Sequence, residues 1–141
     1  MKILAIDPGQ RRIGVAISDP SGKVAFPLTE FSHRSKEEDA KRIIALAEQN
    51  QAELILIGQA LGIDQQPTLQ SRRSFNLAQS IRAQTKIPVV LWDEFETTQI
   101  ALKARREMGV NPQKRSYRLD ALSAAVLLQS YIEHSTSLDH E

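Results

Sequence analysis

The stretch Ile3-Leu4-Ala5-Ile6-Asp7-Pro8-Gly9-Gln10-Arg11-Arg12-Ile13-Gly14-Val15-Ala16-Ile17-Ser18-Asp19 is the part of this chain that most strongly predicts its fold. Two runs of β-branched and aliphatic residues, 2–7 and 12–19, predict two strands, and the intervening Pro8-Gly9 predicts a turn. A carboxylate at the tip of a central strand is poorly placed for packing. Asp7 is instead well placed to hold a divalent cation in the crevice outside the sheet.

The rest of the chain alternates strand-like and helix-like patterns. Ser35 and Glu38 have the spacing of a capping box, and apolar residues then recur at helical spacing through Ala40, Ile43, Ile44 and Ala47. The expected elements are a strand over 24–29 with Pro27 suiting an edge, a helix beginning at Ser35, a buried strand over 53–57, a loop over 59–69, a helix over about 70–84 with Phe75, Ala78 and Ile81 inward, a strand over 88–92, a helix over 96–107, a loop over 109–116 and a helix over about 119–133.

This order predicts an α/β fold. Three antiparallel strands followed by right-handed β-α-β crossovers give a five-stranded mixed sheet with helices on both faces. We expect a single domain over residues 1–133, and a flexible tail over residues 134–141.

Composition narrows the class of protein. The 141 residues are 41% apolar and 25% charged, which is typical of one soluble globular domain. The chain has no cysteine, which excludes disulfides and thiolate metal sites. No run approaches the length of a membrane span, so we expect a cytoplasmic protein that does not bind membranes. The net charge of +1 is low for a dedicated duplex-binding protein.

Two further acids occur at element ends. Glu94 follows the strand that ends at Trp92, and Asp120 opens an apolar helical run. Three such acids are what metal-dependent phosphodiester chemistry needs. Each has a structural alternative: Asp7 could cap a turn, Glu94 could start a helix and Asp120 could be a helix N-cap. Asp93 adjoins Glu94 and could be the ligand instead. Neighbours in a strand point to opposite faces, so we expect only one of the two to reach the site.

Basic residues cluster near these acids and are candidates for binding nucleic acid. As single pairs they could equally be solvated surface residues. Asp19 and Asp64 are expected in turns, and the spacing of His33, His134 and His140 suggests no metal pair. The candidate nucleic-acid-binding residues are Arg11, Arg12, Arg72, Arg73, Lys114, Arg115 and Arg118.

Four separated motifs closely resemble the YqgF family, also called RuvX or Holliday-junction-resolvase-like. The resemblance covers residues 3–133 in the family's order and spacing. The motifs are Ala5-Ile6-Asp7-Pro8-Gly9 through Arg12–Asp19, Leu91-Trp92-Asp93-Glu94 with Thr97-Thr98, Leu119-Asp120-Ala121-Leu122-Ser123-Ala124-Ala125, and Leu128-Gln129-Ser130-Tyr131.

The resemblance implies a ribonuclease-H-like fold and a nuclease that matures the 5′ end of pre-16S ribosomal RNA; such proteins were earlier described as Holliday-junction resolvases. The family's catalytic acids fall on Asp7, Glu94 and Asp120. They would hold two Mg²⁺ or Mn²⁺ ions, with Asp7 bridging. The expected partners are structured RNA or branched DNA and a pre-ribosomal particle. The residues do not separate RNA from DNA, or a monomer from a homodimer.

The chain departs from the family in two places. Phe95 stands where the family often has Arg, and the loop over residues 58–65 lacks the family's common sequence. The loss of a basic residue leaves open a non-catalytic RNA-binding factor for ribosome assembly. A sugar-kinase-like or actin-like phosphotransferase is a third class, suggested by Asp-x-Gly at Asp7 followed by Gly14-Val15-Ala16. The chain has one such domain where that architecture needs two.

Overall fold

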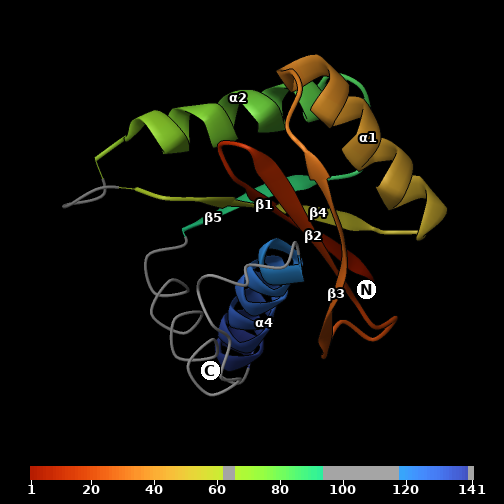
Figure 1. The fold of residues 1–141 in the computed structure, drawn as a ribbon. Helices are drawn as coiled ribbons and strands as arrows, with labels where there is room; N and C mark the ends of the chain where they lie inside the picture. The colour runs from red at the N-terminus through yellow and green to blue at the C-terminus, as the bar shows by residue number, and fades with distance from the viewer. Residues whose placement is uncertain (62–65, 94–117, 140–141) are drawn as a thin grey trace.

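The protein is a mixed sheet with helices on both faces. The computed structural model describes residues 1–61, 66–93 and 118–139. Figure 1 shows α1 and α2 on one side of the sheet and α4 on the other. The described elements are β1 (Ile3–Pro8), β2 (Arg12–Ser18), β3 (Ala25–Ser32), α1 (Lys36–Gln49), β4 (Leu54–Gln59), α2 (Leu69–Arg82), β5 (Val89–Asp93) and α4 (Arg118–Asp139).

The sheet has the strand order β3-β2-β1-β4-β5, which puts β1 in the centre. β2 pairs antiparallel with β1 and β3, whereas β4 pairs parallel with β1 and β5. This arrangement confirms the predicted five-stranded mixed sheet. Pro27 lies on the edge strand β3, as expected, where a missing N–H breaks no interior ladder. The β2–β3 register shifts between Val15 and Ala16.

Both faces of β1 are covered, which explains its continuous apolar sequence. Leu4 and Ile6 pack into a core under α1 and α2, while Ile3 and Ala5 pack into a second core under α4. We call these the α1–α2 core and the α4 core. A side chain's parity along a strand therefore tells which of the two cores it faces.

The N-terminus of α1 is capped by Ser35, as predicted. The Ser35 hydroxyl accepts a hydrogen bond from the Glu38 N–H at 3.1 Å. On this helix Ala40, Ile43 and Ala47 are fully buried. In α2 the inward stripe is Ser74, Leu77, Ala78 and Ile81, and the prediction for Phe75 is wrong, since its side chain is 49% exposed. The buried residues recur at i, i+3, i+4 and i+7, and position 75 lies about 100° off that stripe.

Two other boundaries differ from the prediction. β3 extends to Ser32, because Ser32 pairs with Arg12 of β2. α4 continues to Asp139, so residues 134–139 are helical where a flexible tail was expected. The His134 ring packs on Trp92, with centroids 4.8 Å apart, which anchors this extension. The helix predicted over 96–107 and the loop over 109–116 lie outside the described residues.

The β2–β3 turn is organised by Asp19, as the turn prediction required. Its carboxylate accepts hydrogen bonds from the Ser21 hydroxyl and from the N–H groups of Lys23 and Val24. These bonds, led by that of Ser21, hold the pKa of Asp19 well below its usual range. Across the described parts of the chain, no helix is both long and apolar enough to span a bilayer.

Candidate active site

Asp7 lies near the carboxyl end of the central strand β1, where it is half-buried. Its parity matches that of Ile3 and Ala5, so it belongs to the α4 face of the sheet. Directly after it the chain turns tightly, and the Gly9 N–H donates to the Arg12 carbonyl at 2.9 Å. A Cβ at Gly9 would lie 2.5 Å from that carbonyl oxygen, so glycine is needed to close the turn.

Gly14 brings Asp120 to Asp7. In the β1–β2 ladder Gly14 is the direct partner of Asp7. A Cβ on Gly14 would lie only 1.9 Å from the backbone oxygen of Asp120, in the first turn of α4. The missing side chain therefore admits the start of α4 against the sheet beside Asp7. The backbone of Asp120, more than a hundred residues away in sequence, is thereby brought against the strand pair that holds Asp7.

Glu30 is a third acid at this place, and the sequence analysis missed it. It pairs with Gly14 from the β3 side, opposite Asp7. Its side chain is 9% exposed, and the Arg12 guanidinium is 3.6 Å away. Burial, and then the negative charge of Asp120, raise the pKa of Glu30. Strand register could have identified Glu30, because Gly14 pairs with Asp7 on one side and with Glu30 on the other.

The environment of Glu30 is unusual for a carboxyl group. Both Oε1 and Oε2 are buried without a well-formed hydrogen bond from the described residues, and a side chain that interacts with them, Asp120, is itself an acid. Buried polar groups are normally paired. The Arg12 ion pair is partly solvated, since Arg12 is 50% exposed, and it offsets only part of the cost of burial.

The structure separates Asp93 from Asp7. Asp93 is the last residue of β5 and pairs with Gln59. It has the parity of Leu91, which packs against the α1–α2 core, whereas Trp92 packs against the α4 core. Asp93 is thus on the opposite face from Asp7. Glu94, the predicted third ligand, lies outside the described residues.

The donor chemistry fits a hard divalent cation, because carboxylate oxygens are the preferred ligands of Mg²⁺ and Mn²⁺. In residues 1–61, 66–93 and 118–139, no three His, Asp or Glu side chains are grouped closely enough to hold a metal ion. A metal centre at Asp7 and Asp120 therefore needs a ligand from elsewhere, and Glu94 is the predicted one. The observation that favours such a centre is the convergence of Asp7 and Asp120 at Gly14.

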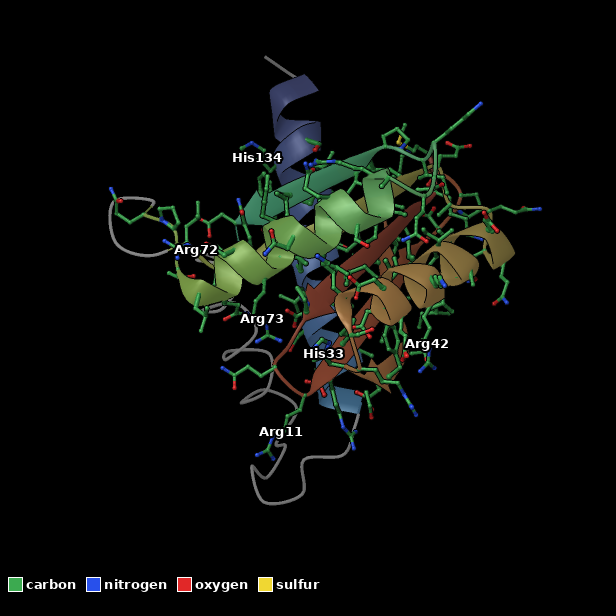
Figure 2. All side chains as sticks on the ribbon, turned by 90° about the horizontal axis from the view of Figure 1, so that it is seen from above. Arg11, His33, Arg42, Arg72, Arg73 and His134 are labelled. Carbon is green, nitrogen blue, oxygen red and sulfur yellow. The ribbon has the colours of Figure 1, made fainter. Side chains whose placement is uncertain are left out.

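The predicted basic residues fall into different settings. Arg12 is the first residue of β2. Figure 2 shows Arg11 at the β1–β2 hairpin and Arg72 and Arg73 on α2. Arg72 is exposed, whereas Arg73 is half-buried and donates from Nη2 to the Gly9 carbonyl at 3.5 Å. Lys114, Arg115 and the side chain of Arg118 lie outside the described part of the chain. The hairpin after Asp7 thus carries two exposed arginines and contacts a third.

Comparison with known protein families gives a match over nearly the whole chain. The model of a family described as RuvX, Holliday junction resolvase, matches residues 1–134. A protein of Syntrophus aciditrophicus named "Putative pre-16S rRNA nuclease" is 37% identical over 133 residues, which are 94% of this chain and 89% of that protein. A Clostridium acetobutylicum protein of the same name is 33% identical over 132 residues, covering 94% and 98%.

Solved structures match the fold. T. thermophilus RuvC in complex with a Holliday junction substrate superposes with a TM-score of 0.59 at 15% identity, covering 96% of both chains. The fowlpox virus Holliday junction resolvase superposes with a TM-score of 0.56 at 14% identity, covering 95% of this chain and 99% of that one. The ribonuclease-H-like architecture expected from the sequence is confirmed.

Proposed function

This chain belongs to the RuvX family of Holliday-junction-resolvase-like nucleases, and we propose that it is a metal-dependent nuclease that processes the 5′ end of pre-16S ribosomal RNA. The observation that carries the proposal is the contact at Gly14, which places the backbone of Asp120 beside Asp7. The RNA substrate is inferred from the names of the two relatives, whose sequences align with 94% of this chain. Such a substrate would place the activity in the cytoplasm, on a pre-ribosomal particle.

Asp7, Asp120 and Glu94 would hold two Mg²⁺ or Mn²⁺ ions. When bound, the ions supply Lewis-acid activation of water and neutralise charge on the scissile phosphate. The protein's own residues fix the geometry. β1 holds Asp7 rigidly in the centre of the sheet, and the close approach at Gly14 sets the position of Asp120. Arg11 and Arg12 on the adjoining hairpin would contact the phosphate backbone.

The test is cleavage of an end-labelled pre-16S leader RNA, with a four-way DNA junction alongside, in magnesium and in manganese. We expect the wild-type protein to cleave the RNA and Asp7→Asn to lose more than about 100-fold of the cleavage rate while keeping its fold. Mutating a residue that only hydrogen-bonds to a metal ligand costs about 10–100-fold, and removing the ligand itself should cost more. Circular dichroism and thermal unfolding check the fold of the variant.

The other outcomes identify the alternatives. Cleavage of the junction in preference to the RNA would make the protein a DNA resolvase, which is the activity named for the structural neighbours. Binding of the RNA by folded protein without any metal-dependent cleavage would make it a ribosome-assembly factor. An unchanged cleavage rate in Asp7→Asn would refute the assignment of the site.

A further inference from the structure

A second site lies on the other face of the same strand end. A pocket of about 260 Å³ is lined by Pro8 and Gly9, which directly follow Asp7, and its apolar wall is Ile13 and Leu77. Both wall residues belong to the α1–α2 core. The pocket and Asp7 therefore flank the end of β1 from opposite faces of the sheet, and one stretch of backbone borders both.

The polar lining of this pocket includes two permanent cations, Arg73 and Lys36. Arg73 from α2, Lys36 from α1 and His33 from the segment after β3 all contribute to it, with the Asn76 amide. Figure 2 shows Arg73 and His33 on the same side of the β1–β2 hairpin, with Arg42 farther along α1. The Arg73 hydrogen bond to Gly9 uses one of the five N–H donors of a guanidinium. Within the described residues this guanidinium makes no other hydrogen bond.

Asp39, the only acid among the described residues that line the pocket, is buried and engaged by hydrogen bonds. Its side chain is 3% exposed. One carboxylate oxygen contacts the His33 Nδ1, and the other accepts from the Arg34 N–H at 3.1 Å. Because Nδ1 is engaged, Nε2 is the His33 nitrogen left for a ligand. Asp39 thus orients His33, and its two carboxylate oxygens are directed to that ring and to the Arg34 backbone.

The start of α1 also borders the pocket, and its first turn carries the acids Glu37, Glu38 and Asp39. Ser35 and Lys36, at the N-terminus of this 14-residue helix, both line the pocket. Helix N-termini attract anions through exposed N–H groups and the helix dipole. The Lys36 ammonium is 3.8 Å from Glu37, but both side chains are more than half exposed, so this pair competes weakly with a bound anion.

We propose that this pocket binds one backbone phosphate of the nucleic-acid substrate, a neighbour of the phosphate cleaved at Asp7. The inference rests on the proposed nuclease function. The volume of the pocket is below the usual range for pockets that enclose whole drug-sized ligands, so the pocket suits a phosphodiester group with its flanking sugar atoms. The substrate strand would cross the carboxyl end of β1, with one phosphate on each face of the sheet.

The experiment measures binding rather than cleavage. Asp7→Asn protein is titrated with fluorescent pre-16S leader RNA and with a four-way junction over a range of salt concentrations. Adding Arg73→Gln or Lys36→Gln should weaken binding and lower the slope of log affinity against log salt by about one, as expected for a lost phosphate contact. Lys36 is half-exposed, so this variant should fold even if Arg73→Gln does not. Lys41→Gln, an exposed α1 position outside the pocket, is the charge-matched control.

A second arm locates the phosphate. Single uncharged methylphosphonate linkages are placed along the bound strand. A methylphosphonate at one position of the strand should weaken binding to the Asp7→Asn protein but not to the protein that carries both Asp7→Asn and Arg73→Gln. If both pocket variants instead gave the same salt slope and the same linkage profile as the Lys41→Gln control, phosphate binding in the pocket would be refuted. That result would leave the proposed nuclease function untouched. Failure of the Asp7→Asn protein to bind either nucleic acid would overturn both proposals.

Discussion

The Glu30 carboxyl group is held in a costly position at the start of α4. Burial, the nearby Asp120 charge and a hydrogen-bonding contact with the Asp120 carboxyl all raise the pKa of Glu30, and both of its oxygens are buried. The folded chain therefore keeps this proton at pH values where the unfolded chain has released it. The contribution of Glu30 to stability is greatest in acid and is lost as the pH rises through the folded-state pKa.

We expect Glu30→Gln to change the pH dependence of stability. Below about pH 4.3, the ordinary pKa of a glutamate, both states of the wild type are protonated at this residue. As the pH rises to 7.5, the free energy of unfolding of Glu30→Gln should increase relative to that of the wild type. Urea denaturation at pH 4 and pH 7.5 in EDTA measures the difference.

The exposed α1 residue Glu48 supplies the control for this prediction. Glu48→Gln should track the wild type at both pH values. If Glu30→Gln also tracked the wild type, the buried carboxyl would carry no energetic penalty in the folded protein, and the description of its environment would be wrong.

At the scale of elements, the contact between α4 and β2 sets the site. α4 rests on the sheet through small and aliphatic residues, including Ala124 and Leu128. The Gln129 Oε1 accepts from the Ala25 N–H at 3.0 Å, which ties the helix to β3 as well. The close approach at Gly14 fixes where the first turn of this helix begins relative to Asp7.

Gly14→Ala should therefore damage both stability and activity. The added Cβ must push the Asp120 backbone away from 1.9 Å, and overpacking of this kind costs on the order of 1–3 kcal/mol. We expect the unfolding free energy to fall by that amount and cleavage to fall much further, because Asp120 moves away from Asp7. Urea denaturation and cleavage at a temperature where the variant is folded measure the two effects.

Gly22→Ala is the matched control, because Gly22 has a φ of +74° in the β2–β3 turn, far from the site. A side chain there costs roughly 1–2 kcal/mol. Its activity, measured while folded, should equal that of the wild type. Equal activity in Gly14→Ala would show that the helix start can shift without consequence for catalysis.

For the whole molecule, a metal ion would join the centre of the sheet to α4 and to the segment after β5. A ligand that binds only the folded state stabilises it by mass action. At magnesium 100-fold above its Kd, the unfolding free energy of the wild type should rise by about 2.7 kcal/mol. Thermal unfolding with and without magnesium measures this rise.

The same measurement distinguishes Glu94 from Asp93. Asp7→Asn, Asp120→Asn and Glu94→Gln should each lose most of the magnesium-dependent rise. Asp93→Asn should keep it, because the strand parity of Asp93 puts it on the α1–α2 face. A rise that survives in Asp7→Asn would mean that magnesium binds elsewhere on the protein.

Local patterns in the sequence determined the elements and the position of Asp7. Runs of β-branched and aliphatic residues marked β1 and β2, Pro8-Gly9 marked the turn, and Ser35 with Glu38 marked the start of α1. The helix stripe in α2 was predicted less well, since Phe75 fits a helical pattern but lies outside the buried face. Periodicity specifies which residues share a face, whereas packing selects the face that is buried.

Only the tertiary structure decided what meets at the ends of those elements. The Gly14–Asp120 approach, the burial of Glu30 and the pocket shared by Gly9, His33 and Arg73 join residues that are distant in the chain. Each depends on strand register and on where a helix docks, and these are set by the balance of many packing contacts at once. A sequence pattern of a few residues reports its own secondary structure, because that is governed by neighbouring residues, and carries no record of such long-range placement.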